Sequence, residues 1–287
     1  MSDQTALQLE KSGYRAFEAE DWERAGRQLA EAAERTESRP AAAELWYDAA
    51  LAYKFLHDWP KAYELGLRAA ALSERGAENP VFWNLGIAAT ILRDWDVARD
   101  AWRGYGIPVP DGTGEIVDQF GMTCLRIATT TGQEVVWARR LCPTRARVMS
   151  VPFDVSRRYG EVVVHDGAPN GERVNDGRTY PVFDELQLFT PSDLATLSVS
   201  VVARREEDAR ALLDAVSAAG FGAETLGSAQ MLCRCCSEGS QTVRRSDQAG
   251  RQTVLLGAPE TDARRLLDAW RAESPADREW EHLHVAG

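Results

Sequence analysis

The sequence has 287 residues, of which 44% are hydrophobic and 27% are charged. This composition is ordinary for a folded soluble protein and excludes a chain that is disordered throughout, while the length predicts two or three domains. The 33 basic and 44 acidic residues leave a net charge of −11, and the acidic excess extends along the whole chain. We therefore expect no direct binding of nucleic acid through a cationic surface.

The sequence contains no recognisable signal for export or for membrane insertion. No run of about 18 uncharged apolar residues occurs, so no transmembrane segment is expected. Met1–Gln4 begins neither a basic nor an apolar segment of the kind found in signal peptides. We expect a cytoplasmic protein of a bacterial type, in which the five cysteines do not form a disulfide framework.

Three similar segments recur in the N-terminal part: Asp21–Ala25, Asp58–Ala62 and Asp94–Ala98. Their alanines are 37 and then 36 residues apart, and a small residue precedes each alanine by 12 positions. These small residues are Gly13, Ala50 and Gly86. Small residues at matched positions of two consecutive helices let the helices approach closely. We therefore predict three antiparallel helical hairpins, with the alanines in the second helices.

The aspartates of these segments mark where each second helix should begin. Asp21, Asp58 and Asp94 can accept hydrogen bonds from free N–H groups of the first turn and oppose the helix dipole. Pro60 is compatible with a first turn, because that turn needs no internal donor.

The pattern resembles the tetratricopeptide repeat (TPR), a helix-turn-helix unit of about 34 residues. The resemblance covers roughly residues 5–106, and the second unit matches best. The first unit lacks the opening tryptophan, and the terminal proline of the repeat is missing or displaced, at Pro40 and Pro80. The residues that carry the match are Gly13, Ala25, Leu29 and Ala32, then Trp46, Ala50, Tyr53, Ala62 and Ala69, then Leu85, Gly86, Ala98 and Trp102.

A TPR array has a concave face formed by the first helix of each hairpin, and the resemblance implies that a partner binds there. This face is aromatic and acidic here, with Lys54 as its basic group. TPRs that hold the C-terminal carboxylate of a chaperone use Lys, Asn and Arg, so that role is not expected. Alternatively, several of these aromatic residues pack against the rest of the chain. The predicted partner-binding residues are Glu10, Tyr14, Phe17, Glu44, Tyr47, Leu51, Lys54, Trp83 and Ile87.

Residues 111–195 are predicted to form an antiparallel β-rich module that follows a linker rich in glycine and proline. We expect Asp166-Gly167, Asn170-Gly171 and Asp176-Gly177 to form turns between strands. The module would cover the open apolar end of a three-repeat array. The expected strands are Met122–Ala128, Glu134–Ala138, Arg147–Val151, Glu161–His165 and Val182–Phe189.

Residues 196–287 are predicted to form a ferredoxin-like α/β sandwich, because a strand-helix-strand pattern occurs twice. With helical repeats in residues 1–110, the whole chain is then of the α+β class. Such a fold hosts many functions and does not indicate an activity by itself. The expected strands are Leu197–Ala203, Gly222–Leu226, Gln252–Leu256 and Trp280–Val285, and the expected helices are Glu206–Ala219 and Thr261–Ala272.

Cys233, Cys235 and Cys236 place three thiols within four residues. Together with His282 and His284 on the last strand, they would offer Cys and His ligands to zinc, and neighbouring thiols can also be redox-active. However, the spacing is not the usual two-residue gap, and no second cysteine pair follows. We therefore expect no metal and no other cofactor.

Two further pairs of adjacent residues suggest catalysis, but neither is accompanied by the other groups that a catalytic site needs. His165 beside Asp166 would suit a general base, yet no nucleophile is placed to use it, and Asp166-Gly167 favours a turn. Asp184 and Glu185 would suit paired acids or Mg²⁺ ligands, but adjacent strand residues point to opposite faces. The sequence has no P-loop, no dinucleotide-binding glycine motif and no HExxH motif. We expect no catalytic residues and no enzyme.

An acidic helical-repeat protein with two appended β-containing modules is similar to the TPR-containing immunity proteins encoded beside interbacterial toxins. The segment Tyr159–Leu188 is similar to the downstream module of that class. The resemblance implies a stoichiometric inhibitor of a cognate toxin. A cytoplasmic inhibitor must meet a toxin that acts in the cytoplasm, and toxins that contact nucleic acid carry basic surfaces that an acidic inhibitor complements. The expected partner is therefore a nuclease effector, such as one delivered by a type VI secretion system.

Two other functions stay open at this point. The chain would also suit a general TPR scaffold or regulator with an endogenous partner. A metal-binding or enzymatic C-terminal domain is the other alternative. A toxin gene beside this one would favour immunity, whereas stoichiometric zinc in the purified protein would favour the last alternative.

Overall fold

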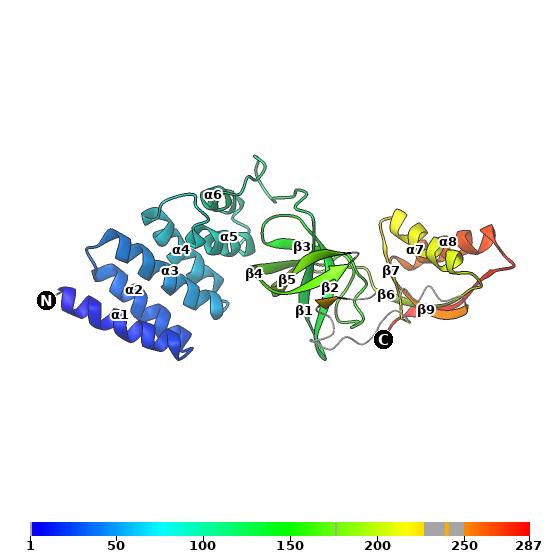
Figure 1. The fold of residues 1–287 in the computed structure, drawn as a ribbon, viewed down its shortest axis with the longest axis horizontal. Helices are drawn as coiled ribbons and strands as arrows, with labels where there is room; N and C mark the ends of the chain where they lie inside the picture. Colours follow the sequence, from blue (N-terminus) through cyan, green and yellow to red (C-terminus); the bar gives the residue numbers. More distant parts are fainter. Residues whose placement is uncertain (1, 176, 227–238, 241–249) are drawn as a thin grey trace. The chain divides into compact units, whose positions relative to one another are not determined.

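The computed structural model of the protein describes residues 2–175, 177–226, 239–240 and 250–287 (Figure 1). The chain divides into two compact units. The first, called the helical unit below, comprises Met1–Asp118 with Cys142–Thr144, and the second, called the β unit, comprises Gln119–Leu141 with Arg145–Gly287. The helices precede the sheets along the chain, so the predicted α+β class is confirmed.

Successive helices of the helical unit pack as antiparallel hairpins, as predicted (Figure 1). Their bounds are α1 Ser2–Glu18, α2 Trp22–Arg35, α3 Arg39–Phe55, α4 Trp59–Leu72, α5 Pro80–Ile91 and α6 Trp95–Tyr105. Among the described residues of the chain, no helix has both the length and the apolar character needed to cross a membrane.

The second helix of each hairpin begins as the aspartates predict. The Asp21, Asp58 and Asp94 side chains accept hydrogen bonds from the backbone N–H groups three residues later, at 3.4, 3.1 and 3.2 Å. Pro60 lies in the first turn of α4. Each aspartate follows a residue in the left-handed region, which lets the chain reverse over a very short turn. These residues are Glu20, His57 and Arg93, with φ angles of 57°, 56° and 61°.

The small residues lie at the helix crossings. Ala25 and Ala98 are fully buried, and Ala62 is 5% exposed. A Cβ atom added at Gly13 would approach Leu29 to 2.8 Å, and one added at Gly86 would approach Trp102 to 2.6 Å. A glycine on the first helix is therefore matched by a large side chain 16 residues later on the second helix.

Ala62→Leu should overpack the crossing of α3 and α4, because Ala62 is buried there and leucine adds three carbon atoms. We expect a loss of roughly 1–3 kcal/mol in the free energy of unfolding, measured from the urea midpoint of the helical unit. Ala71→Leu is the matched control, since Ala71 is exposed on the same helix. Equal midpoints for the two variants would contradict the close approach of the helices.

The N-terminal strands of the β unit form a sheet that closes on itself. Its strands are β1 Met122–Thr129, β2 Gly132–Arg140, β3 Arg145–Val148, β4 Val162–Asn175, β5 Arg178–Thr190 and β8 Gly239–Ser240. The order is β3-β2-β1-β5-β4-β8, and β3 also pairs with β4. The sheet is thus a closed ring of β1 to β5, with β8 paired to β4. Alternate side chains, such as Val136, Ala138 and Val148, fill its core.

The predicted antiparallel character of this module needs one correction. Consecutive strands pair in antiparallel fashion, but β1 and β5 pair in parallel, through Cys124–Val182 and the two residue pairs that follow. An odd number of strands explains this, because each hairpin reverses the direction and the first and fifth strands then run the same way. β4 and β8 are also parallel.

Two of the predicted turns in this module are wrong. Asp166-Gly167 and Asn170-Gly171 lie inside β4, which extends from Val162 to Asn175. The register between β4 and β5 shifts near these residues, so β4 accommodates the dipeptides as bulges and not as chain reversals. The chain reverses after β4 at the third dipeptide, of which Gly177 is described and has a φ of 74°.

The C-terminal part is the predicted ferredoxin-like sandwich. Its chain order is β6 Thr196–Ala203, α7 Glu206–Ala218, β7 Gly222–Thr225, β9 Gly250–Gly257, α8 Glu260–Glu273 and β10 Arg278–Val285. The sheet order is β10-β6-β9-β7 with every pair antiparallel. The two helices cover the same face of this sheet (Figure 1), and Leu212, Leu267 and Trp270 pack there against strand residues such as Val199 and Leu256.

Tyr159 joins the closed sheet to the sandwich within the β unit. Gly222 and Gly257 are directly opposite each other on β7 and β9, and a Cβ atom at either position would come within 2.4 Å of the Tyr159 side chain. The Tyr159 hydroxyl donates to the Gly220 carbonyl oxygen at 3.2 Å. The pair of glycines therefore forms a slot that the tyrosine fills.

Candidate functional site

The predicted partner-binding residues lie on α1, α3 and α5, which hydrogen bonds hold together. The Tyr14 hydroxyl donates to Asp48 Oδ2 at 2.8 Å, which links α1 to α3. Lys54 Nζ donates to Asn84 Oδ1 at 3.1 Å, and Asn84 Nδ2 donates to the Tyr47 hydroxyl at 3.4 Å. Three of the predicted residues thus bridge neighbouring helices, and Lys54 is buried.

Ile87 does not lie on an open face. It is 0% exposed, so the prediction that it contacts a partner is wrong. The sequence of α5 predicts this burial, because Asn84 and Thr90 are the only polar residues of the helix. A helix that is apolar on all sides is buried on all sides.

Phe17 and Trp83 pack mainly within the helical unit. Phe17 lies edge-on to Trp22 with ring centroids 5.0 Å apart, and Phe55 is 6.1 Å away. Trp83 lies edge-on to the fully buried Trp102 at 5.2 Å. Both predicted residues are partly exposed, as are Glu10 and Leu51.

A hollow of about 610 Å³ opens where the ends of α3, α4 and α5 meet. We call it the α3–α5 hollow. Glu44 and Tyr47, two of the predicted residues, line it together with Glu74, Leu72 and Val81. In the part of the chain that the structure describes, the carboxylates of Glu44 and Glu74 have no hydrogen bond or ion pair. The hollow therefore combines an aromatic and apolar wall with two unpaired negative charges.

More negative charge lies beside the hollow. Burial and then the hydrogen bond to Asp48 raise the pKa of the Tyr14 hydroxyl, and the charges of Glu44 and Glu10 raise it further. Burial also raises the pKa of Asp48. The basic group at the rim is Arg39, whose Nη2 donates to the Ala71 carbonyl oxygen at 3.2 Å.

Sequence reasoning missed Leu72 and Glu74, because the repeat pattern assigns binding to the first helices alone. Leu72 is the last residue of α4, and Glu74 lies in the connection from α4 to α5, which Asn79 holds in place. Asn79 Oδ1 accepts from the Val81 N–H at 3.1 Å, and its Nδ2 donates to the Glu74 carbonyl oxygen at 3.0 Å. The signal in the sequence was Asn79 before Pro80, a helix start that fixes the preceding loop.

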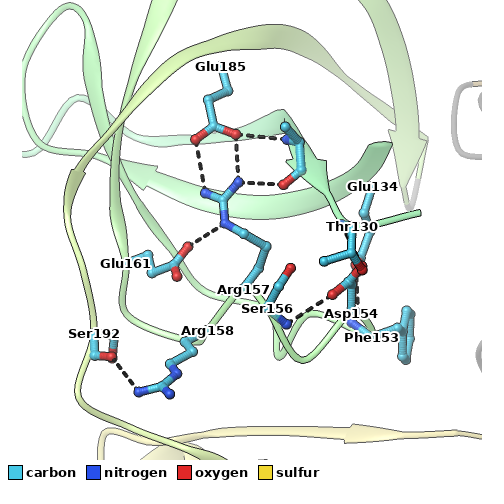
Figure 2. A network of polar contacts seen from close by, with 11 residues as sticks. Thr130, Glu134, Phe153, Asp154, Ser156, Arg157, Arg158, Glu161, Glu185 and Ser192 are labelled. Carbon is cyan, nitrogen blue, oxygen red and sulfur yellow. Dashed lines mark hydrogen bonds and ion pairs between the residues drawn. The ribbon is translucent and has the colours of Figure 1, made fainter. Parts of the chain in front are cut away.

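A second polar cluster, in the β unit, surrounds Arg157 (Figure 2). Its guanidinium donates to Glu161 Oε2 at 2.8 Å and forms two hydrogen bonds with Glu185, at 2.7 and 3.0 Å. The three side chains are at most 10% exposed. Arg157 Nη1 also donates to the Ala128 carbonyl oxygen at 2.7 Å.

This cluster fixes the loop between β3 and β4. In the same loop, Asp154 accepts from Thr130 N, Thr130 Oγ1 and Ser156 N at 2.9, 2.6 and 2.9 Å, and these bonds lower its pKa. Phe153 N donates to Glu134 Oε2 at 3.1 Å. The groups around Arg157 bond to one another in the interior and those around Asp154 do so at the surface (Figure 2), so both sets of contacts support the loop.

His165 and Asp166 do not form the arrangement of a general base. His165 is fully buried, and Nδ1 lies 2.7 Å from the backbone oxygen of Asp166. Burial lowers the pKa of His165 to about 4. The Asp166 carboxylate instead accepts from the Gly167 N–H at 2.6 Å.

Asp184 and Glu185 point to different partners, as their adjacent positions on β5 predict. Asp184 pairs with Arg126 and accepts from Asn170 Nδ2 at 2.7 Å. Glu185, the next residue on β5, instead pairs with Arg157. The two carboxylates therefore do not converge on one ion.

Cys233, Cys235 and Cys236 lie outside the described residues. His282 and His284 are exposed on β10 and do not simply alternate on one face, because the strand is irregular between Glu281 and His284 and His282 has a φ of 59°. His284 Nδ1 lies 2.8 Å from the His282 carbonyl oxygen.

No protein-family model matches this chain. No curated protein matches it at a significant level.

Proposed function

We propose that this chain is a cytoplasmic binding protein that inhibits a basic partner protein by stoichiometric association, with the α3–α5 hollow holding a basic segment of that partner. The observation that carries the proposal is the pair of unpaired carboxylates, Glu44 and Glu74, beside the half-buried Tyr47. The partner that suits it best is a cognate toxin that acts on nucleic acid, which makes the chain an immunity protein of TPR type. In this proposal the chain is not an enzyme.

Charge complementarity supports the choice of a basic segment. A lysine or arginine side chain in the hollow would meet two carboxylates without displacing any ion pair of the protein. Its aliphatic stem would contact Leu72 and Val81, while its charged end would lie near the ring of Tyr47. An acidic segment would instead face Glu44, Glu74 and the other carboxylates around Tyr14. The net charge of −11 would also speed the approach of a basic partner.

Charge reversal tests the hollow directly. In the complex with a partner captured from the native strain, Glu44→Lys and Glu74→Lys should each slow association and weaken its dependence on salt. Glu18→Lys is the matched control, because Glu18 is exposed on α1, has no ion pair within the described ranges and gives the same change in net charge. Equal effects of all three variants would leave only a general electrostatic attraction and would contradict binding in the hollow.

The aromatic wall provides a second measurement on the same complex. Tyr47→Ala should cost about 2–4 kcal/mol of binding if Tyr47 is a central anchor of the interface. Tyr47→Phe keeps the ring and loses the hydroxyl that Asn84 contacts, so it controls for changes in the helical unit. An affinity that Tyr47→Ala leaves unchanged would move the interface away from the hollow.

Protection of cells separates immunity from a scaffold function. Cells that express the product of a neighbouring toxin gene should survive only when this chain is co-expressed, and Glu44→Lys should reduce that survival. If the captured partner is an endogenous protein and no toxin is neutralised, the scaffold alternative replaces immunity.

A further inference from the structure

Arg139 and Arg147 form an exposed pair of like charges on the closed sheet. They are directly opposite each other on β2 and β3. Their neighbours Ala138 and Val148 point into the core, so the two arginines share the outer face of the sheet. Side chains at directly opposite positions have Cβ atoms only about 4.5–5.5 Å apart, and like charges there are destabilising.

Neither arginine has an acidic partner in the part of the chain that the structure describes. Within that part, Arg139 and Arg147 form no ion pair and no side-chain hydrogen bond. Other arginines of the same module are engaged: Arg126 pairs with Asp184, and Arg157 pairs with Glu161 and Glu185. A chain with 44 acidic residues thus pairs the buried Arg126 and Arg157 with carboxylates, whereas the two exposed arginines have no such partner among the described residues.

The arginine pair lies close to a buried tyrosine. Both arginines lie near enough to Tyr159 for their charges to lower its pKa against the effect of burial. Tyr159 is immobilised between Gly222 and Gly257 and bonds to Gly220. The two arginines therefore extend from paired strands near one enclosed aromatic side chain.

We propose that Arg139 and Arg147 bind a phosphate group, supplied either as free phosphate or as a phosphomonoester. Two guanidinium groups offer paired N–H donors that match the oxygens of a phosphate, and a dianion neutralises both positive charges at once. Occupation of the site removes the repulsion between the strands and so stabilises the β unit. This inference is independent of the proposed function of the helical unit.

Titration of the full chain with inorganic phosphate tests the proposal, with chloride added to hold the ionic strength constant. Binding should saturate, and Arg139→Gln and Arg147→Gln should each weaken it at least tenfold. Arg178→Gln is the matched control, since Arg178 is exposed on the same sheet and has no ion pair among the described residues, and it should change affinity less than twofold. Phosphoserine and glycerol phosphate are titrated in the same way. Tighter binding of these phosphomonoesters than of inorganic phosphate would identify a phosphomonoester as the ligand, and weaker binding would identify free phosphate.

Melting temperatures measured with and without phosphate separate phosphate binding by the two arginines from a purely structural role of these residues. Without phosphate, Arg147→Gln should raise the melting temperature, because one of two repelling charges is removed. With saturating phosphate the order should invert, and the wild-type chain should melt at the higher temperature. Phosphate stabilisation that is equal in the wild type, Arg147→Gln and Arg178→Gln would overturn the proposal, as would titrations that do not saturate.

Discussion

Tyr159→Ala should lower the free energy of unfolding of the β unit by about 3–5 kcal/mol, the range for removing a large buried aromatic side chain. Tyr159 is 8% exposed and packs with Val151 and Leu255, so its removal leaves a cavity between the closed sheet and the sandwich. Tyr159→Phe should cost about 1 kcal/mol, because it loses only the hydrogen bond to Gly220. Urea denaturation followed by tryptophan fluorescence measures both.

A double-mutant cycle with Gly222 tests whether the slot and the ring fit each other. Gly222→Ala places its Cβ 2.4 Å from a ring carbon of Tyr159 and 2.8 Å from Val151 Cγ2, and it should cost about 1–3 kcal/mol in the wild-type background. In the Tyr159→Ala background the contact with the ring is gone and the contact with Val151 remains, so the same change should cost less, by about 0.5–3 kcal/mol. Additive costs would mean that the tyrosine does not fill the glycine slot.

Stability should change little between pH 4.5 and 6.5, because the buried His165 and the partly buried Glu224 have opposite effects there. Burial lowers the pKa of His165 to about 4 from its ordinary 6.5. The unfolded chain therefore takes up this proton first, and stability falls by up to about 3 kcal/mol as the pH drops from 6.5 to 4. Burial, and then the charge of Glu134, raise the pKa of Glu224 from 4.5 to about 7. The folded chain keeps this proton longer, so stability falls by up to about 3 kcal/mol as the pH rises from 4.5 to 7.

Single substitutions should uncover each effect. Glu224→Gln removes the loss at rising pH, so the variant should gain stability steadily between pH 4 and 6.5. His165→Phe removes the opposite effect, and its stability should fall between pH 4.5 and 7. The free energy of unfolding of both variants, measured at steps of half a pH unit, tests these opposite trends. Parallel pH profiles for the two variants would show that Glu224 and His165 do not have opposite effects.

Local patterns predicted the helices well because each depends on residues close in sequence. The aspartates before Trp22, Trp59 and Trp95 cap their helices through contacts three residues away. The strands of the sandwich were found for a similar reason, since their apolar residues alternate and short turns separate them.

The errors arose where residues far apart decide the structure. Asp166-Gly167 is the same dipeptide in a turn and in a bulge, and only the pairing of β4 with β5 selects the bulge. The parallel pairing of β1 with β5 likewise depends on how many strands close the sheet, which no local segment reveals.

The proposed sites draw on the sequence only in part. The repeat pattern predicts Glu44 and Tyr47 as partner-binding residues, but Glu74 comes from a connection that this pattern does not describe. Arg139 and Arg147 are visible in the sequence as two of several arginines. Their opposition depends on the register of β2 and β3, which joins residues eight positions apart.

The steric fit inside each hairpin limits how such a chain can be rebuilt in evolution. Gly13 makes room for Leu29, and Gly86 makes room for Trp102, whereas the corresponding position of α3 is Ala50. A first helix taken from the second hairpin would therefore bring a methyl group against Leu29 or Trp102. Genetic exchange that moves a whole hairpin carries both halves of the fit together. The segment that can be shuffled in this protein is thus the hairpin of about 36 residues, and not the single helix.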